Sequence, residues 1–405
     1  MNQDARAALW VVLWSRTITT FSGGVSALAY SYSAIHHLGG PSAGVAVATC
    51  TAAGVLVGNV FGGLADFVRA PLVIASAGVL GILTSGSAYL IADAEQYTLP
   101  LWCLLASLSG IVTAAVARGE NTAIVHVAPR EDLQQLFSAV SIRAQAASAA
   151  AGTVSGIIIA TDPSGPFLID CAGWGLNVLL VIPLALRYPS GGANRPAFAA
   201  PELLRGFTFI AERRPLLVIV LVSAFANMFL AGAGAVITID LITRGVDVRL
   251  IGLLETGVNL AALLGSIVSG VLSRRFATRL LFVTVLLSLT ASMLATAVWG
   301  NTFVIMGALA CGVFLIPTLG VSAAVTLASW TPNELQARVS GANSVMSLVL
   351  TSVSPAALGS IYVHTSRFVV ISLVASGTLA AAIVSGRLIP TVVSASSRLE
   401  VTAAD

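Results

Sequence analysis

Lysine is absent from this chain, and all 20 basic residues are arginine. Without lysine there is no Walker A motif to hold the phosphates of ATP, and no amine to form a Schiff base with retinal or pyridoxal phosphate. A built-in ATP motor of the P-loop type is therefore excluded, and so are proteins that bind either cofactor through a lysine.

Cysteine and charge are also scarce. The four cysteines are Cys50, Cys103, Cys171 and Cys311, and they form no CxxC pair, so we expect neither a zinc site nor a disulfide framework. We find no metal-ligand cluster, nucleophile elbow or cofactor motif, so no cofactor or metal is expected and an enzyme is the least favoured class. The net charge of +3 is too small to indicate nucleic acid binding.

Apolar residues are what the chain has in excess. Hydrophobic residues make up 57% and charged residues 9%, with a mean hydropathy of +0.95, whereas a soluble domain is about a quarter charged. A lipid bilayer must therefore be part of its solvent, and a spanning helix needs about 20 apolar residues. We expect an all-α membrane protein with twelve spans, at 8–30, 43–65, 72–92, 99–119, 137–160, 167–186, 216–237, 250–273, 279–299, 302–328, 341–362 and 368–387.

The arginines predict the orientation of these spans. With the N-terminus inside, fourteen arginines fall in inner segments, and only Arg244, Arg249 and Arg367 fall in outer loops. This bias predicts that both termini are cytoplasmic. No cleavable signal peptide is predicted, because the first apolar run already has the length of a span.

A long connection divides the spans into two groups of six. We expect an N-terminal six-helix bundle at 1–186, a cytoplasmic linker at 187–215, a C-terminal six-helix bundle at 216–388 and a cytoplasmic tail at 389–405. The linker begins with Pro, Ser and Gly residues typical of a flexible segment. Its second part has helical apolar spacing, including Leu203 and Phe207, which predicts a short amphipathic helix on the inner surface.

The two groups carry similar short motifs. Gly62–Asp66 ends the second span and Gly270–Arg274 ends the eighth, while Pro129–Gln134 follows the fourth and Pro332–Gln336 follows the tenth. These matches indicate duplication of a six-span unit. Parallel repeats of this kind are typical of transporters whose halves rock about a central site.

These motifs resemble the major facilitator superfamily (MFS). Gly62-x-Leu64-Ala65-Asp66 is similar to the start of its signature between spans two and three, but Phe67 and Arg69 depart from the family's basic pattern. Ser15–Ile18, Pro129–Gln134 and Thr331–Gly341 are similar to a branch of drug and siderophore exporters that includes the enterobactin exporter and macrolide efflux proteins.

This resemblance implies a fold of two pseudo-symmetric six-helix bundles. It also implies proton-coupled export of a small amphipathic compound, such as a drug, antibiotic or siderophore, by alternating access in a bacterial cytoplasmic membrane. The expected partners are that compound, protons and the lipid bilayer, and we expect a monomer. An importer or uniporter of a small metabolite stays open, because sequence does not encode direction, and so does a non-transporting membrane receptor or scaffold.

Ionisable residues inside spans are the candidates for proton coupling, because a charge held in lipid is costly. Glu255 is the first choice, about five residues into the eighth span, with Asn259 one turn further on the same face. The alternative is a partly hydrated Glu stabilised by the dipole of its helix N-terminus. Glu120 is the second candidate for proton coupling.

Four further charged residues have predicted roles. The resemblance implies that Asp66, at the inner end of the second span, is a conformational latch near the start of the eleventh; an ordinary interfacial Asp is the alternative. Arg16 is an embedded charge that contacts either a carboxylate or the transport path. Arg118 and Glu120 are two residues apart, so they point to nearly opposite sides of a helix and do not pair with each other. Arg143 in the fifth span is the expected partner of Glu120, in a buried structural pair, with a proton relay as the alternative.

Polar and aromatic stripes give the candidates for the substrate cavity. Such faces avoid lipid, and each could equally be a contact that holds helices together. The candidates are Ser22, Ser26, Tyr30, Asn227, Phe229, Asn259, Asn343 and Ser347. The spacing of Gly54, Gly58 and Gly62, and of Gly152 and Gly156, predicts seams where two helices pack closely.

Overall fold

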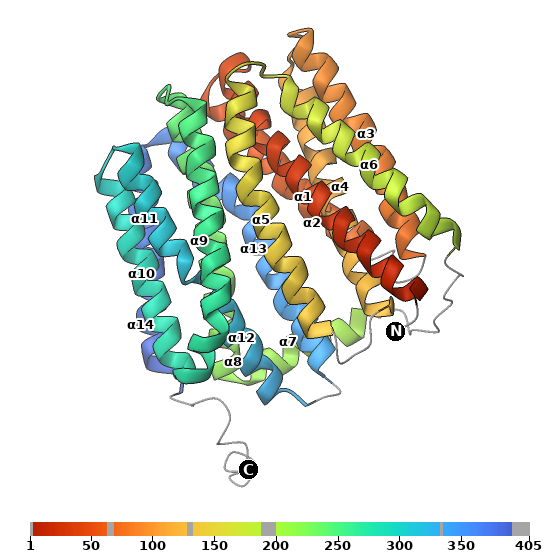
Figure 1. Ribbon diagram of the computed structural model, residues 1–405. Helices are drawn as coiled ribbons and strands as arrows, with labels where there is room; N and C mark the ends of the chain where they lie inside the picture. The colour runs from red at the N-terminus through yellow and green to blue at the C-terminus, as the bar shows by residue number, and fades with distance from the viewer. Residues whose placement is uncertain (1–2, 63–68, 128–132, 188–199, 333–334, 391–405) are drawn as a thin grey trace. The chain divides into compact units, whose positions relative to one another are not determined.

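In the computed structural model the chain is helical, and no strand occurs among the described residues, which are 3–62, 69–127, 133–187, 200–332 and 335–390. The helices are α1 (Gln3–His37), α2 (Pro41–Gly62), α3 (Ala70–Asp93), α4 (Leu99–Val127), α5 (Leu133–Ile159), α6 (Gly165–Arg187), α7 (Ala200–Glu212), α8 (Arg214–Thr243), α9 (Val248–Arg275), α10 (Thr278–Val298), α11 (Thr302–Phe314), α12 (Ile316–Trp330), α13 (Gln336–His364) and α14 (Arg367–Leu388). Figure 1 shows these helices along the chain. The predicted all-helical membrane fold is confirmed.

Eleven segments within the described residues are long and apolar enough to cross a membrane, and α11 with α12 counts as one of them. The 35-residue helix α1 lies outside this set. Arg16 and the frequent Ser and Thr residues lower its hydropathy, so the first predicted span is the most polar one.

Local sequence explains where several helices begin. Pro71 occupies the first turn of α3, where its missing N–H costs nothing. Asn301 caps α11, because its side chain accepts hydrogen bonds from the backbone N–H groups of Phe303 and Val304. Pro317 lies in the first turn of α12, immediately after the break at Leu315, where its missing N–H costs no helical hydrogen bond. Pro183, by contrast, lies inside the unbroken α6.

The chain forms two compact units. The first unit comprises residues 1–194 and 235–259, and the second comprises residues 195–234 and 260–405. Each of α8 and α9 therefore contributes residues to both units.

Helices of the first unit pack through small residues. In Figure 1, α2 lies beside α4 and α3 beside α6. A Cβ added to Gly54 would collide with the backbone of Ser107, and one added to Gly58 would collide with the backbone of Ile111. The seam predicted from Gly54 and Gly58 is thus confirmed as the close contact between α2 and α4.

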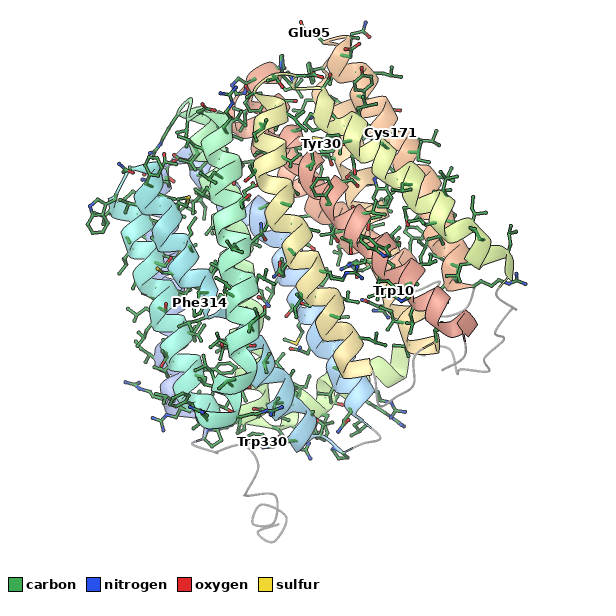
Figure 2. All side chains as sticks on the ribbon, in the orientation of Figure 1. Trp10, Tyr30, Glu95, Cys171, Phe314 and Trp330 are labelled. Carbon is green, nitrogen blue, oxygen red and sulfur yellow. The ribbon has the colours of Figure 1, made fainter. Side chains whose placement is uncertain are left out.

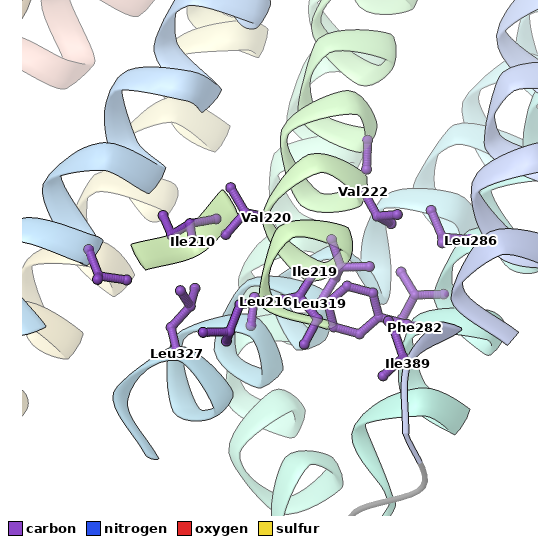
Figure 3. Packing of buried hydrophobic residues seen from close by; sticks show 14 of the residues in the cluster. Ile210, Leu216, Ile219, Val220, Val222, Phe282, Leu286, Leu319, Leu327 and Ile389 are labelled. Atoms are coloured by element: carbon purple, nitrogen blue, oxygen red, sulfur yellow. The ribbon is translucent and has the colours of Figure 1, made fainter. Parts of the chain in front are cut away.

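The second unit has an apolar core centred on α8. Leu216 and Ile219 are fully buried there against Phe282 of α10, as Figure 3 shows. The predicted amphipathic helix exists as α7, and its Ile210 belongs to this core. A Cβ at Gly206 would collide with the backbone of Arg338, so α7 packs closely against α13.

Candidate functional site

An ion pair inside the first unit joins α1 to α4. Nη1 of Arg16 lies 3.3 Å from Oε2 of Glu120. The Glu120 side chain is 1% exposed and that of Arg16 is 27% exposed. Both residues were predicted to be embedded charges, but the expected partner of Glu120 was Arg143. The structure corrects that pairing, because α1 and not α5 brings an arginine to this carboxylate.

Ser15 and Asn177 extend this ion pair into a hydrogen-bond network. The Ser15 hydroxyl lies 2.5 Å from Oε1 of Glu120 and 2.7 Å from Oδ1 of Asn177 on α6. Both neighbours are acceptors, yet a hydroxyl has a single hydrogen to donate. Nδ2 of Asn177 is buried and lacks a partner among the described residues.

Two arrangements give each of the two Ser15 contacts one donor and one acceptor. With Glu120 ionised, Ser15 donates to the carboxylate and the Asn177 amide turns so that its Nδ2 donates to Ser15. With Glu120 protonated, the acid donates to Ser15, which then donates to Oδ1 of Asn177. The two directions of the network thus correspond to the two protonation states of one carboxyl group.

The other embedded arginines lie apart from this pair. Arg118 is exposed whereas Glu120 is buried, as their two-residue spacing predicts. The guanidinium of Arg143 lies 4.7 Å from the ring centroid of Trp14 and 5.7 Å from that of Trp10. Cation–π contact with α1 therefore takes the place of the expected ion pair.

Glu255 lies half-buried on α9, in the part of that helix that belongs to the first unit. No hydrogen bond or ion pair of its carboxylate is found within the described part of the chain. Asn259 donates from Nδ2 to the Glu255 backbone oxygen at 2.9 Å, so the amide bonds its own helix. The neighbouring Thr256 hydroxyl lies 2.8 Å from that of Thr153 and donates to the Ala149 backbone oxygen at 2.6 Å, which fixes α9 to α5.

Close glycine packing supports this contact between α9 and α5. A Cβ at Gly152 would lie 2.8 Å from the backbone oxygen of Gly252, and a Cβ at Gly156 would lie 2.7 Å from that of Val248. The seam predicted from Gly152 and Gly156 is thus confirmed, and it holds the helix that carries Glu255.

Three substrate-cavity candidates lie buried on α1. Ser22 is 2% exposed, Ser26 is 1% and Tyr30 is 4%. Ser26 donates to Asp170 at 3.0 Å, and the Tyr30 ring packs edge-on against Phe167 of α6. In this structure they contact protein groups within the first unit, and their contact with substrate stays a prediction.

Four candidates lie in the second unit. Asn227 is exposed on α8, and Phe229 packs against Gly377 of α14. Asn343 and Ser347 are half-buried on α13, one turn apart. Their role in a substrate cavity stays a prediction, and the predicted latch Asp66 lies outside the described residues.

Two aspartates near the ends of predicted spans are buried in the structure. Asp170 on α6 is 1% exposed and Asp240 on α8 is 5% exposed. Asp240 pairs with Arg244 at 2.8 Å. Asp170 accepts hydrogen bonds at Oδ2 from Ser26 and from Ser85 of α3, at 3.0 and 2.7 Å. Their burial depends on packing against other helices, which the sequence alone does not show.

The described residues contain no group of three or more His, Cys, Asp or Glu side chains able to hold a metal ion. The Arg16–Glu120 pair can take up a proton at its carboxylate, and the ion pair can be made and broken.

The comparisons with known proteins agree with the observed fold. The family model described as Major Facilitator Superfamily matches residues 12–355. A search of curated proteins finds no match.

Several solved structures share the fold. A mutant of the nucleoside transporter NupG is 14% identical, with a TM-score of 0.75 over 94% of this chain and 100% of that one. A D-xylose–proton symporter is 12% identical, with a TM-score of 0.71 over 95% and 98% of the two chains. The inward-open xylose transporter XylE from E. coli is 13% identical, with a TM-score of 0.71 over 98% and 99%.

Proposed function

The chain belongs to the Major Facilitator Superfamily, and we propose that it is a proton-coupled transporter that exports a small amphipathic compound. Members of this family are carriers of small molecules that work by alternating access, and they are generally not enzymes. The proposal adds three points to this: the coupling ion, the residue that binds it and the direction of transport.

The network around Glu120 carries the proposal. An ionised Glu120 holds Arg16 by charge and by a hydrogen bond at 3.3 Å. A protonated Glu120 loses most of that attraction, while Ser15 and Asn177 still satisfy its hydrogen bonds in the reversed direction. Proton binding therefore frees the Arg16 guanidinium without leaving Glu120 unpaired, which is the property required of a coupling carboxyl.

Glu255 is the alternative coupling residue. It is half-buried in the first unit, beside the threonine that fixes α9 to α5. Protonation there would remove a charge, but no cation within the described residues would be released by it. For that reason we place Glu120 ahead of Glu255 and keep both as proposals.

Export rather than import rests on the resemblance of the α1 segment Ser15–Ile18 and of two loops to the drug and siderophore exporters. Aromatic side chains along α1 and α8, including Trp14 and Phe225, suit a bulky, partly aromatic compound. Import is the second candidate, since the solved structures with this fold include a D-xylose–proton symporter. A receptor or scaffold without transport is the third.

Reconstitution in liposomes with a trapped pH-sensitive dye tests the proposal. A panel of antibiotics and siderophores is added to wild type, Glu120→Gln and Glu255→Gln. Proton movement opposite to the compound, lost in Glu120→Gln and kept in Glu255→Gln, is the expected result. Movement in the same direction would identify a symporter, and flux preserved in Glu120→Gln would refute the assigned coupling residue.

A further inference from the structure

Asp170 is a buried carboxyl group that the proposed mechanism does not use. It lies on α6, where α1 and α3 pack against it, and its side chain is 1% exposed. Figure 2 shows this part of the first unit, with Tyr30 labelled on α1 and Cys171, the neighbour of Asp170, on α6.

The two carboxyl oxygens of Asp170 have different surroundings. Oδ2 accepts from Ser26 and Ser85. Oδ1 is buried and has no hydrogen-bond partner within the described part of the chain. The Ser22 side chain lies beside this carboxyl group, and its hydroxyl is likewise buried and unpartnered there.

No positive charge compensates Asp170 among the residues that the structure describes. Arg16 of α1 is paired with Glu120, and Arg143 of α5 lies over Trp14. The titratable neighbours are Tyr30 on α1 and Cys171 on α6, and both are neutral in their ordinary state. The other neighbours are Ser85 on α3 and Trp174 on α6, which carry no charge.

An isolated ionised carboxylate at such a site is costly, because burial removes its hydration without supplying a counter-charge. A proton on the carboxyl group removes the charge, and the resulting acid still accepts hydrogen bonds from Ser26 and Ser85 at Oδ2. Gly173 brings the α6 backbone so close to Ser22 that even a Cβ would collide with it, so little else fits between the two helices.

We propose that Asp170 is a second proton-binding site, in which a neutral carboxylic acid links α6 to Ser22 and Ser26 of α1 and to Ser85 of α3. This site is separate from Glu120 and does not depend on the transport proposal. Asn177, which bonds the Ser15 hydroxyl of the Glu120 network, lies two helical turns after Asp170 on α6. Asp170 bonds Ser26 on the same helix α1. The Glu120 network and the Asp170 site therefore both contact the interface between α1 and α6.

Infrared spectroscopy of the purified protein at neutral pH tests this site, because a protonated carboxylic acid has its own C=O stretching band. We expect that band in wild type and its loss in Asp170→Asn. Asp240→Asn is the matched control: Asp240 is also buried but is paired with Arg244, so its replacement should leave the band in place. Glu120→Gln identifies any contribution of the Glu120 carboxyl group to this band.

Asn has the shape of a neutral aspartic acid, so Asp170→Asn should also fold with an unchanged melting temperature. A variant that failed to fold would overturn the proposal, and so would an unchanged band. Spectra in sodium chloride and in choline chloride should match. A band seen only without sodium would overturn the proposal by showing that Na⁺ occupies the site instead.

Discussion

Arg16 on α1 and Glu120 on α4 form an ion pair at 3.3 Å, and the glutamate is almost completely buried. Each residue is separated from the other by more than a hundred positions in the chain, so only the fold brings them together. A proton on Glu120 would remove the charge that holds Arg16, and most of the predictions below follow from this pair.

Removal of the arginine alone should be worse than removal of both charges. Arg16→Gln leaves Glu120 buried without its cation, and breaking a buried pair in this way costs about 3–5 kcal/mol. Since part of the Arg16 side chain reaches solvent, we expect a value near the lower end. The double variant Arg16→Gln/Glu120→Gln should recover most of the loss in thermal unfolding in detergent; a double variant no more stable than the single one would contradict the pairing.

Ser15 should matter more than an ordinary helix serine. Ser15→Ala deprives both Glu120 and Asn177 of a hydrogen-bond partner, and unsatisfied buried groups cost about 1–3 kcal/mol. Ser76→Ala is the control, because the Ser76 hydroxyl is exposed and bonds only the backbone of its own helix. Equal melting temperatures for the two variants would show that the Ser15 network contributes nothing.

Replacement of glycine by alanine should have opposite effects at two positions. At Gly252 the new methyl group would collide with the backbone of Gly152, so we expect destabilisation by about 1–3 kcal/mol and separation of α9 from α5. At Gly175 on α6 nothing lies within 4 Å of the new atom, and alanine should stabilise the helix by up to about 1 kcal/mol. Thermal unfolding of both variants checks the sign, and a stabilised Gly252→Ala would refute the close contact.

The lengths of the apolar runs and the spacing of apolar residues were enough to predict most of the helices. The apolar runs located the helices that cross the membrane, and the amphipathic spacing around Phe207 predicted α7. The glycine spacings predicted close seams on α2 and α5, although the sequence did not say which helices would fill them. That information is tertiary: α4 packs on Gly54 and α9 on Gly152.

The candidate site was only half predictable for the same reason. Embedded charges such as Arg16 and Glu120 stand out in an apolar sequence, and Ser15, Ser22 and Ser26 share one face of a helix. Their partners depend on helix adjacency, so Glu120 was matched with Arg143 and Asn177 was missed. The one available signal was the seven-residue spacing of Asp170 and Asn177, which matches that of Ser15 and Ser22.

The most direct test of the central claim is proton release from purified protein in weakly buffered detergent when a transported compound is added. If binding of the compound displaces the proton from Glu120, wild type and Glu255→Gln should acidify the solution, and Glu120→Gln should not. Acidification that persists in Glu120→Gln, or proton uptake in place of release, would contradict an exporter that exchanges its substrate for a proton at Glu120.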